Sequence, residues 1–119
     1  MRNNPISVSV IIPIYKVESF IVRCVESLFN QSLSEGVEFI FVNDATPDRS
    51  VELLQEQLGF FPSRKEQVIL LEHAENKGLP AARNTGLSVA KGEYVFHCDS
   101  DDFLEADGLE KMYKAAKEK

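Results

Sequence analysis

Apolar residues recur along this chain with two alternating spacings. Residues 7–12 (SVSVII) are mostly β-branched and Pro13 follows them, a pattern that predicts a strand buried on both faces. The next apolar residues keep the i, i+3, i+4, i+7 spacing of a helix with one apolar face over three turns. They are Val17, Phe20, Ile21, Cys24, Val25, Leu28 and Phe29.

The same alternation continues to the end of the chain. Three more strands are predicted, at residues 37–42, 67–71 and 93–98. Thr46 as the N-cap and Pro47 in the first helical position predict a helix that ends near Gly59. A third helix is predicted to start near Pro80, and a fourth, amphipathic helix covers residues 109–116.

The resulting order, βαβαβαβα, predicts an α/β fold with a mostly parallel central sheet and helices on both faces. A chain of 119 residues has the length of one domain, so we expect a single domain over residues 1–119. Ligands of such sheets bind beyond the carboxyl ends of the strands. The segments that follow the four predicted strands are therefore where a functional site is expected.

Charge and hydropathy exclude some classes of partner and location for the chain. The net charge is −6 and the basic residues are scattered, whereas nucleic-acid-binding proteins carry a basic face, so we expect no nucleic acid partner. No stretch approaches the ~20 apolar residues that span a bilayer, so we expect no transmembrane segment. The apolar run at residues 8–15 predicts a strand and not a signal peptide. Cys24 and Cys98 are expected to be small, buried, apolar residues in a reducing cytosol.

The fourth predicted strand runs into an acidic cluster, Asp99-Ser100-Asp101-Asp102. Neighbouring carboxylates repel each other by about 1 kcal/mol in water and about 4 kcal/mol when partly buried, so a cation or several N–H donors must offset the repulsion. Carboxylate oxygens suit Mg²⁺ or Mn²⁺. The alternative is that these acids only cap the following helix.

Polar residues follow the other predicted strands as well. Asp44 could accept two hydrogen bonds from a nucleobase, or it could form an Asx turn within its own loop. Lys77 and Arg83 lie at the start of the third helix, where an anion could bind, and Arg83 could instead form an internal ion pair with the acidic cluster. Tyr15 and Glu18 flank the first turn, where a ring or carboxylate could contact a base or ribose, although Tyr15 could equally be a packing residue at the rim.

The two histidines are too few for a histidine-rich zinc site. We expect His73 to be exposed and His97 to pack against a helix in its neutral form. Neither receives a role.

Five motifs in this chain resemble those of the family 2 glycosyltransferases of GT-A fold. They are VSVIIPIYK (8–16), CVESLFNQS (24–32), FIFVNDATPDRS (39–50), NKGLPAARNTGLSVAKGEY (76–94) and DSDDF (99–103). They follow the family's order and cover nearly the whole chain. The resemblance implies a Rossmann-like GT-A domain that binds a nucleoside-diphosphate sugar, with a UDP-sugar favoured.

The resemblance also implies roles for individual residues. Pro13, Tyr15 and Glu18 would line the nucleotide pocket, and Asp44 would contact the base. Asp99 and Asp101 would form the family's DXD motif on either side of Ser100, which would also contact the nucleotide-sugar. Asp101 is then the principal ligand of Mn²⁺ or Mg²⁺, with Asp99 nearer the ribose and the sugar. Lys77 and Arg83 would lie near the nucleotide or hold the acidic loop.

Two of the motifs depart from the family's pattern. The family commonly has Asn where this chain has Lys16, and it commonly has Asp-Asp-Gly-Ser where this chain has Asn43-Asp44-Ala45-Thr46. Ala45 therefore gives its loop less conformational freedom than glycine would. The second Asp of that motif is kept, as Asp44.

The implied reaction is an inverting, hexosyltransferase-like transfer to an acceptor hydroxyl on a carbohydrate or a lipid-linked acceptor, in the synthesis of a cell-surface polysaccharide or glycan. We expect the catalytic base beyond Lys119, because GT-A domains are roughly twice this length, and we expect the domain to be incomplete at its C-terminal end. The expected location is the cytoplasm, with a peripheral position at the inner membrane face left open, as is the oligomeric state. The alternatives are a nucleotide-binding fragment without turnover and a sugar nucleotidyltransferase, which would need a Gly-rich, Arg-bearing loop after the first strand.

Overall fold

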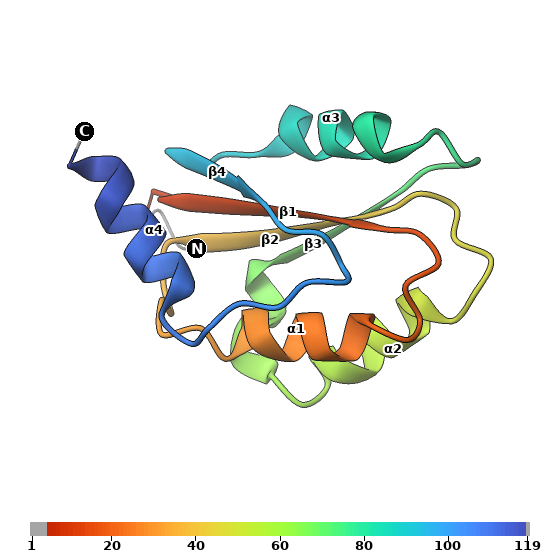
Figure 1. Cartoon of the computed structure of the whole chain (residues 1–119), viewed down its shortest axis with the longest axis horizontal. Helices are drawn as coiled ribbons and strands as arrows, with labels where there is room; N and C mark the ends of the chain where they lie inside the picture. Colours follow the sequence, from red (N-terminus) through yellow and green to blue (C-terminus); the bar gives the residue numbers. More distant parts are fainter. Residues whose placement is uncertain (1–4, 119) are drawn as a thin grey trace.

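The computed structural model describes residues 5–118, which form a four-stranded parallel sheet with helices on both faces (Figure 1). The strands are β1 (Val8–Ile14), β2 (Val37–Asn43), β3 (Val68–Glu72) and β4 (Tyr94–His97). The helices are α1 (Ile21–Phe29), α2 (Ser50–Leu58), α3 (Leu79–Val89) and α4 (Gly108–Lys117), with a 3-10 helix, η1 (Pro62–Gln67), before β3. The predicted α/β architecture is confirmed.

The strands lie in the order β3-β2-β1-β4, and every neighbouring pair is parallel. The chain therefore moves outward from β1 to β3 and then returns across the sheet through α3 to place β4 on the other side of β1. This reversal of direction beside β1 is the place where open α/β sheets bind their ligands. In Figure 1 the carboxyl ends of β1 and β2 lead into the loops at the right of the view.

Two apolar layers hold the helices to the sheet. Alternate residues of β1, among them Val10 and Ile12, pack with α1, α2 and α4 in the larger layer, whereas Ile11 faces α3 in the smaller one. Phe39 and Phe41 of β2 are fully buried against the edge of Phe29. Burying one such side chain contributes about 1.5–3 kcal/mol, so β1 and β2 are the most strongly anchored strands.

β1 continues through Pro13 to Ile14, two residues beyond the predicted end. Proline lacks the N–H that a central strand normally donates. The Pro13 carbonyl accepts a hydrogen bond from Ser100 Oγ, on the side of β1 that faces β4, and β4 pairs with β1 only as far as Ile11. The N and C=O of one strand residue point to the same side, so the Pro13 nitrogen also faces β4. No residue of β4 pairs with β1 at that position, so the missing N–H of Pro13 costs the sheet no hydrogen bond.

Both of the first two helices begin later than predicted, α1 by four residues and α2 by three. Residues 17–20 form a turn before α1, in which the Val17 carbonyl accepts from the N–H groups of Phe20 and Ile21. The predicted N-cap at Thr46 is wrong, because α2 begins at Ser50 and the Thr46 hydroxyl is used elsewhere. It accepts from Lys16 N at 2.8 Å and donates to Asp48 at 2.7 Å. Within residues 5–118, no helix is long and apolar enough to cross a membrane.

Candidate functional site

A cavity of about 480 Å³ opens at the carboxyl ends of β1, β2 and β4, beside the start of α3. Its volume lies in the range of small-molecule sites. The structure brings six of the predicted site residues to its walls: Pro13, Tyr15, Asp44, Asp99, Ser100 and Asp101. The walls also include Gly78, at the predicted start of the third helix beside Lys77. They further include Val17, Asn76, Leu79 and Ala82, which the sequence did not single out as contacts.

Asp99, Ser100 and Asp101 of the acidic cluster line one wall of this cavity. One carboxylate oxygen from each of Asp99, Asp101 and Asp102 lies within 4.8 Å of the others. Ser100 is buried between them and donates to the Pro13 carbonyl, which ties the cluster to the end of β1. Three oxygen donors on one short loop fit the preference of Mg²⁺ and Mn²⁺ for carboxylates that leave room for substrate oxygens. Asp102, to which no role was assigned, contributes one of these oxygens but does not line the cavity.

Arg83 of α3 places a positive charge beside the cluster. Its Nη2 lies 3.1 Å from Asp99 Oδ1, so the predicted internal ion pair is present. Among residues 5–118, Nε of the same guanidinium is buried without a hydrogen-bond partner. The side chains of both partners are more than a third exposed, so the pair contributes little to the stability of the fold.

Cys24 and Cys98 lie beneath the acidic cluster, with both thiols near the Asp99 carbonyl. They are buried and form no disulfide, so their predicted packing role is confirmed. The hydrogen bond with Cys98, burial and the nearby carboxylates raise the pKa of the Cys24 thiol. A protonated thiol is a weak nucleophile and a weak metal ligand, which favours the carboxylates over Cys24 as candidate ligands.

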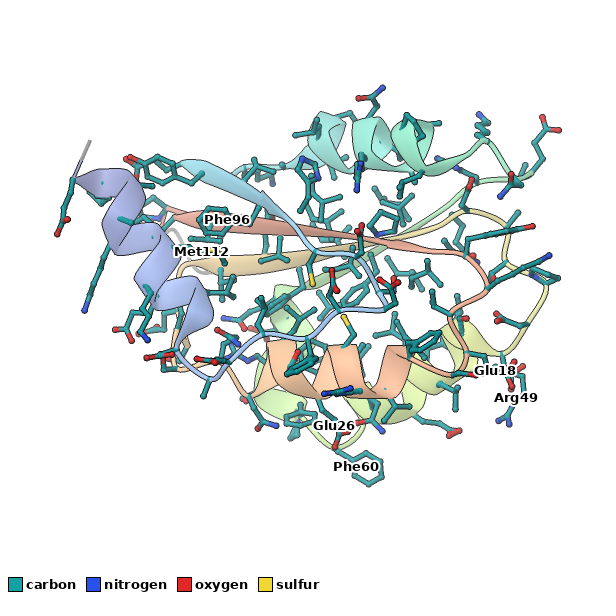
Figure 2. All side chains as sticks on the ribbon, in the orientation of Figure 1. Glu18, Glu26, Arg49, Phe60, Phe96 and Met112 are labelled. Carbon is teal, nitrogen blue, oxygen red and sulfur yellow. The ribbon has the colours of Figure 1, made fainter. Side chains whose placement is uncertain are left out.

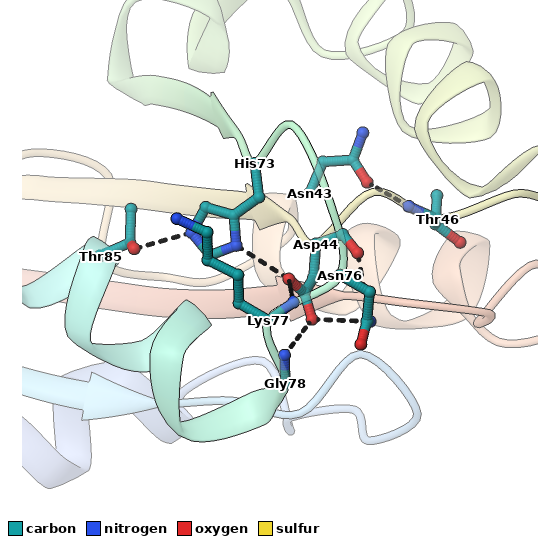
Figure 3. Close-up of polar contacts among 8 residues, drawn as sticks. All are labelled: Asn43, Asp44, Thr46, His73, Asn76, Lys77, Gly78 and Thr85. Atoms are coloured by element: carbon teal, nitrogen blue, oxygen red, sulfur yellow. Dashed lines mark hydrogen bonds and ion pairs between the residues drawn. The ribbon is translucent and has the colours of Figure 1, made fainter.

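Asp44 lies at the end of β2 and is 3% exposed. Its carboxylate accepts four hydrogen bonds, all from the segment that follows β3 (Figure 3). The donors are His73 Nδ1 (2.8 Å), Asn76 Nδ2 (2.9 Å), Lys77 N (2.8 Å) and Gly78 N (2.9 Å). Burial alone would raise the pKa of this carboxyl, but the bonds from His73, Lys77 and Gly78 outweigh it and hold the pKa below its ordinary value of 3.8.

These contacts test one of the two interpretations of Asp44, the Asx turn, whereas its contact with a base stays a prediction. The predicted Asx turn at Asp44 is wrong, because its donors lie 29 to 34 residues further along the chain. Asn43 makes that local contact instead, since its Oδ1 accepts from Thr46 N at 2.9 Å. An ionised carboxylate has about four acceptor positions, so all of those on Asp44 are taken.

His73 and His97 both differ from their predictions. His73 was expected to be exposed, but its side chain is 7% exposed and bonded at both ring nitrogens. His97 was expected to pack against a helix, but it is exposed, because β4 is an edge strand and its last residue has a strand neighbour on one side only. The sequence signal for His73 was its place two residues after a predicted strand.

Glu18 and the Lys77 side chain do not line the cavity. Glu18 accepts from Arg49 N at 3.0 Å, and its own N–H donates to Asp48 at 3.2 Å. It therefore ties the first loop to the start of α2. Lys77 contributes its backbone N–H to Asp44.

Lys16 and Ala45, two of the positions that depart from the family's pattern, have positive φ angles of 53° and 57°. Side chains other than those of Gly, Asn and Asp rarely adopt this left-handed conformation. The family's common Asn and Gly at these positions therefore suit the backbone better than the residues present. The bond from Lys16 N to the Thr46 hydroxyl joins the loops that follow β1 and β2.

Comparisons with known proteins agree with this geometry. The model of glycosyl transferase family 2 matches residues 9–119. The chain is 39% identical over 111 residues to the uncharacterized glycosyltransferase EpsJ of Bacillus subtilis, covering 93% of this chain and 30% of that protein.

Two solved structures share the fold. S. aureus TarS 1-349 in complex with UDP-GlcNAc superposes with a TM-score of 0.82 and 26% identity, over 94% of this chain and 31% of that one. The mannosyltransferase PcManGT from Pyrobaculum calidifontis, in complex with GDP-Man and Mn²⁺, gives a TM-score of 0.81 and 25% identity, over 97% and 32%. The chain thus spans about a third of each of these proteins. It belongs to glycosyl transferase family 2 and has the family's Rossmann-like GT-A fold.

Proposed function

We propose that this chain binds the nucleoside-diphosphate-sugar donor and a divalent cation of a glycosyltransferase. The observation that carries the proposal is the acidic cluster in the wall of a ligand-sized cavity at the topological reversal of the sheet. Three carboxylates beside an anionic diphosphate would repel it, and a bound cation removes that conflict. The cations that prefer such oxygen ligands are those that bind phosphates.

Asp101 and Asp99 would hold the cation, which would be Mn²⁺ or Mg²⁺ and would neutralise the diphosphate as it leaves. Asp101 is exposed at the cavity, whereas Asp99 shares its charge with Arg83, which favours Asp101 as the principal ligand. The Mn²⁺ complex of the mannosyltransferase neighbour supports a metal of this class.

The remaining walls suit the nucleotide. Tyr15 offers a partly exposed ring and Pro13 an apolar surface at the end of β1, where a flat base could pack. Arg83 would keep the acidic loop in place through Asp99, and Glu18 would act from outside the cavity by bracing the first loop. The TarS complex with UDP-GlcNAc supports UDP as the nucleotide, and GDP is the alternative because the second neighbour holds GDP-Man.

The proposed reaction is the attack of an acceptor hydroxyl on the anomeric carbon, with inversion. The hydroxyl proton passes to a general base as the bond to the diphosphate breaks. The base and the acceptor, on a carbohydrate or a lipid-linked chain, stay predictions.

Titration calorimetry with UDP, GDP and their sugars, with and without Mn²⁺, tests the proposal. We expect binding that needs Mn²⁺ and is lost in Asp101→Asn, which removes charge with little change of shape. Asp107→Asn is the matched control, because Asp107 lies outside the cavity and pairs with Lys111 at the start of α4. Equal binding in a chelator, or unchanged binding in Asp101→Asn, would refute the metal assignment.

A further inference from the structure

We propose that His73 is a positioning residue for the nucleotide pocket. Its Nδ1–H orients the Asp44 carboxylate, which in turn holds the segment 76–78 as a wall of the pocket. This inference rests on the proposed function, because it assigns His73 to the same cavity.

His73 connects three elements of the fold. Its backbone N–H donates to the Asn43 carbonyl at 2.9 Å, which continues the pairing of β3 with β2. Its Nδ1 lies 2.8 Å from Asp44 Oδ1, and its Nε2 lies 2.8 Å from the Thr85 hydroxyl on α3. Figure 3 shows the ring between these two partners, with the carboxylate on the side of the segment 76–78. Both side chains of the His73–Asp44 pair are less than a tenth exposed, so no water competes easily for the bond.

The chemistry of the partners fixes the proton on this ring. An ionised carboxylate is only an acceptor, so Nδ1 must carry the hydrogen in the contact with Asp44. The Thr85 hydroxyl can both donate and accept, so it satisfies Nε2 in either protonation state of the ring. Rotation of the Thr85 hydroxyl can satisfy Nε2 in either state, but Asp44 can accept only from a protonated Nδ1. The bond from Nδ1 to Asp44 is therefore the contact that fixes the ring.

The Asp44 carboxylate connects the His73 ring to the residues of the pocket wall. Its remaining acceptor positions hold Asn76 Nδ2 and the N–H groups of Lys77 and Gly78. Gly78 has a φ of 96° and immediately precedes the first residue of α3. Asn76 and Gly78 line the cavity, so a shift of the carboxylate moves two of its wall residues directly.

The same segment also sets the position of the acidic wall. α3 begins at Leu79, and Arg83 lies about one turn further along, where it pairs with Asp99. A loosened segment 76–78 would shift the start of α3, and both sides of the cavity would then change together. Loss of the His73 bond should therefore weaken nucleotide binding although His73 itself does not line the cavity.

The experiment compares substitutions that keep one of the two ring contacts. His73→Asn places an amide nitrogen near the position of Nδ1 and keeps a donor for Asp44. His73→Gln reaches towards the position of Nε2 and loses the contact with Asp44. Thr85→Ala removes the partner of Nε2 and leaves Asp44 untouched, so it serves as the matched control.

We expect His73→Gln to weaken nucleotide binding, measured by calorimetry with saturating Mn²⁺, by about tenfold or more, since a hydrogen bond to a charged group is lost. His73→Asn and Thr85→Ala should stay within about threefold of the unsubstituted protein. The amide signals of Lys77 and Gly78 in ¹H–¹⁵N spectra without nucleotide should move in His73→Gln and return towards their original positions in His73→Asn. Urea unfolding of each variant shows what fraction is folded under the binding conditions.

Equal affinity in His73→Gln and His73→Asn, or a loss in His73→Gln accounted for by its unfolded fraction, would overturn the positioning role. Failure of the unsubstituted protein to bind any nucleotide would instead count against the proposed function. In that case the amide signals still show whether His73 orders the segment 76–78, and unmoved signals would refute that ordering as well.

Discussion

The substitution Asp44→Asn exchanges one carboxylate oxygen for an amide group in the middle of four donors. The new side chain keeps one oxygen, which can serve two of the donors. Its NH₂ group then faces the other two, and donors cannot pair with each other. Because Asp44 is 3% exposed, water has little room to take the place of the lost acceptor.

The cost follows from the two hydrogen bonds that are lost. A hydrogen bond to a charged group contributes about 1.5–3 kcal/mol, so two of them set an upper limit of about 6 kcal/mol. Asn76 is exposed and can turn its amide to solvent, which lowers the expected cost to about 2–4 kcal/mol. That loss is a large part of the total of about 5–15 kcal/mol that stabilises a domain.

Urea unfolding measures this loss, and the chain contains a matched control in Asp48. The Asp48 carboxylate also accepts four hydrogen bonds, from the Thr46 hydroxyl, from the N–H and hydroxyl of Ser50, and from Glu18 N. It is half-buried at the start of α2, where water can reach it, so Asp48→Asn should cost about 1 kcal/mol or less. If the two substitutions cost the same, burial is not what makes the Asp44 contacts valuable, and the reasoning fails.

The pH dependence of unfolding gives the same prediction a second readout. The pKa of Asp44 is lowered in the folded state, so its contribution to stability is fully present above the unfolded value of 3.8. The contribution is lost as the pH falls below 3.8 and through the lower folded pKa. Asp44→Asn should therefore flatten the fall in unfolding free energy below that pH, and an unchanged acid limb would contradict the assignment.

Two further substitutions test the packing of the site's framework. A β-carbon at Gly86 would lie 2.6 Å from Ile11 Cγ2. Gly86→Ala should therefore destabilise the protein by about 1–2 kcal/mol in urea unfolding, because the cost of overpacking exceeds the gain in helix propensity of about 1 kcal/mol. A stabilised variant would show that α3 can move away from β1 at little cost. Ala45→Gly should stabilise the protein by up to about 1 kcal/mol, because it relieves the φ of 57° at the end of β2, and a lower urea midpoint would contradict the strain argument.

Much of the fold followed from local patterns in the sequence. The runs that form β1 and β2 are β-branched or aromatic, and the helical spacing of α1 is regular, so their types and order were predictable. The start of α2 was not predictable in this way, because Thr46 followed by Pro47 has the local sequence of a helix N-cap. Its hydroxyl bonds to Lys16, which is distant in sequence and near only after the sheet has formed.

The site was predictable where its residues act as a local group. Asp99, Ser100 and Asp101 are adjacent in sequence, and their place after a strand was enough to locate them. Asp44 and His73 were harder, because each residue alone has an ordinary local explanation. Their roles arise from the pairing of β2 with β3, which brings together side chains 29 residues apart.

The cavity walls come from both ends of the described chain, with Pro13 on the first strand and Asp99 after the last. The pairing that joins these ends, between β1 and β4, connects residues as distant as Val8 and Tyr94. No partly folded chain lacking that pairing can possess the cavity. A molecule that fills it therefore binds the native state alone, and at a hundred times its dissociation constant it would raise the free energy of unfolding by about 2.7 kcal/mol. Thermal stability measured against added compounds would thus report occupancy of the cavity without any assay of catalysis.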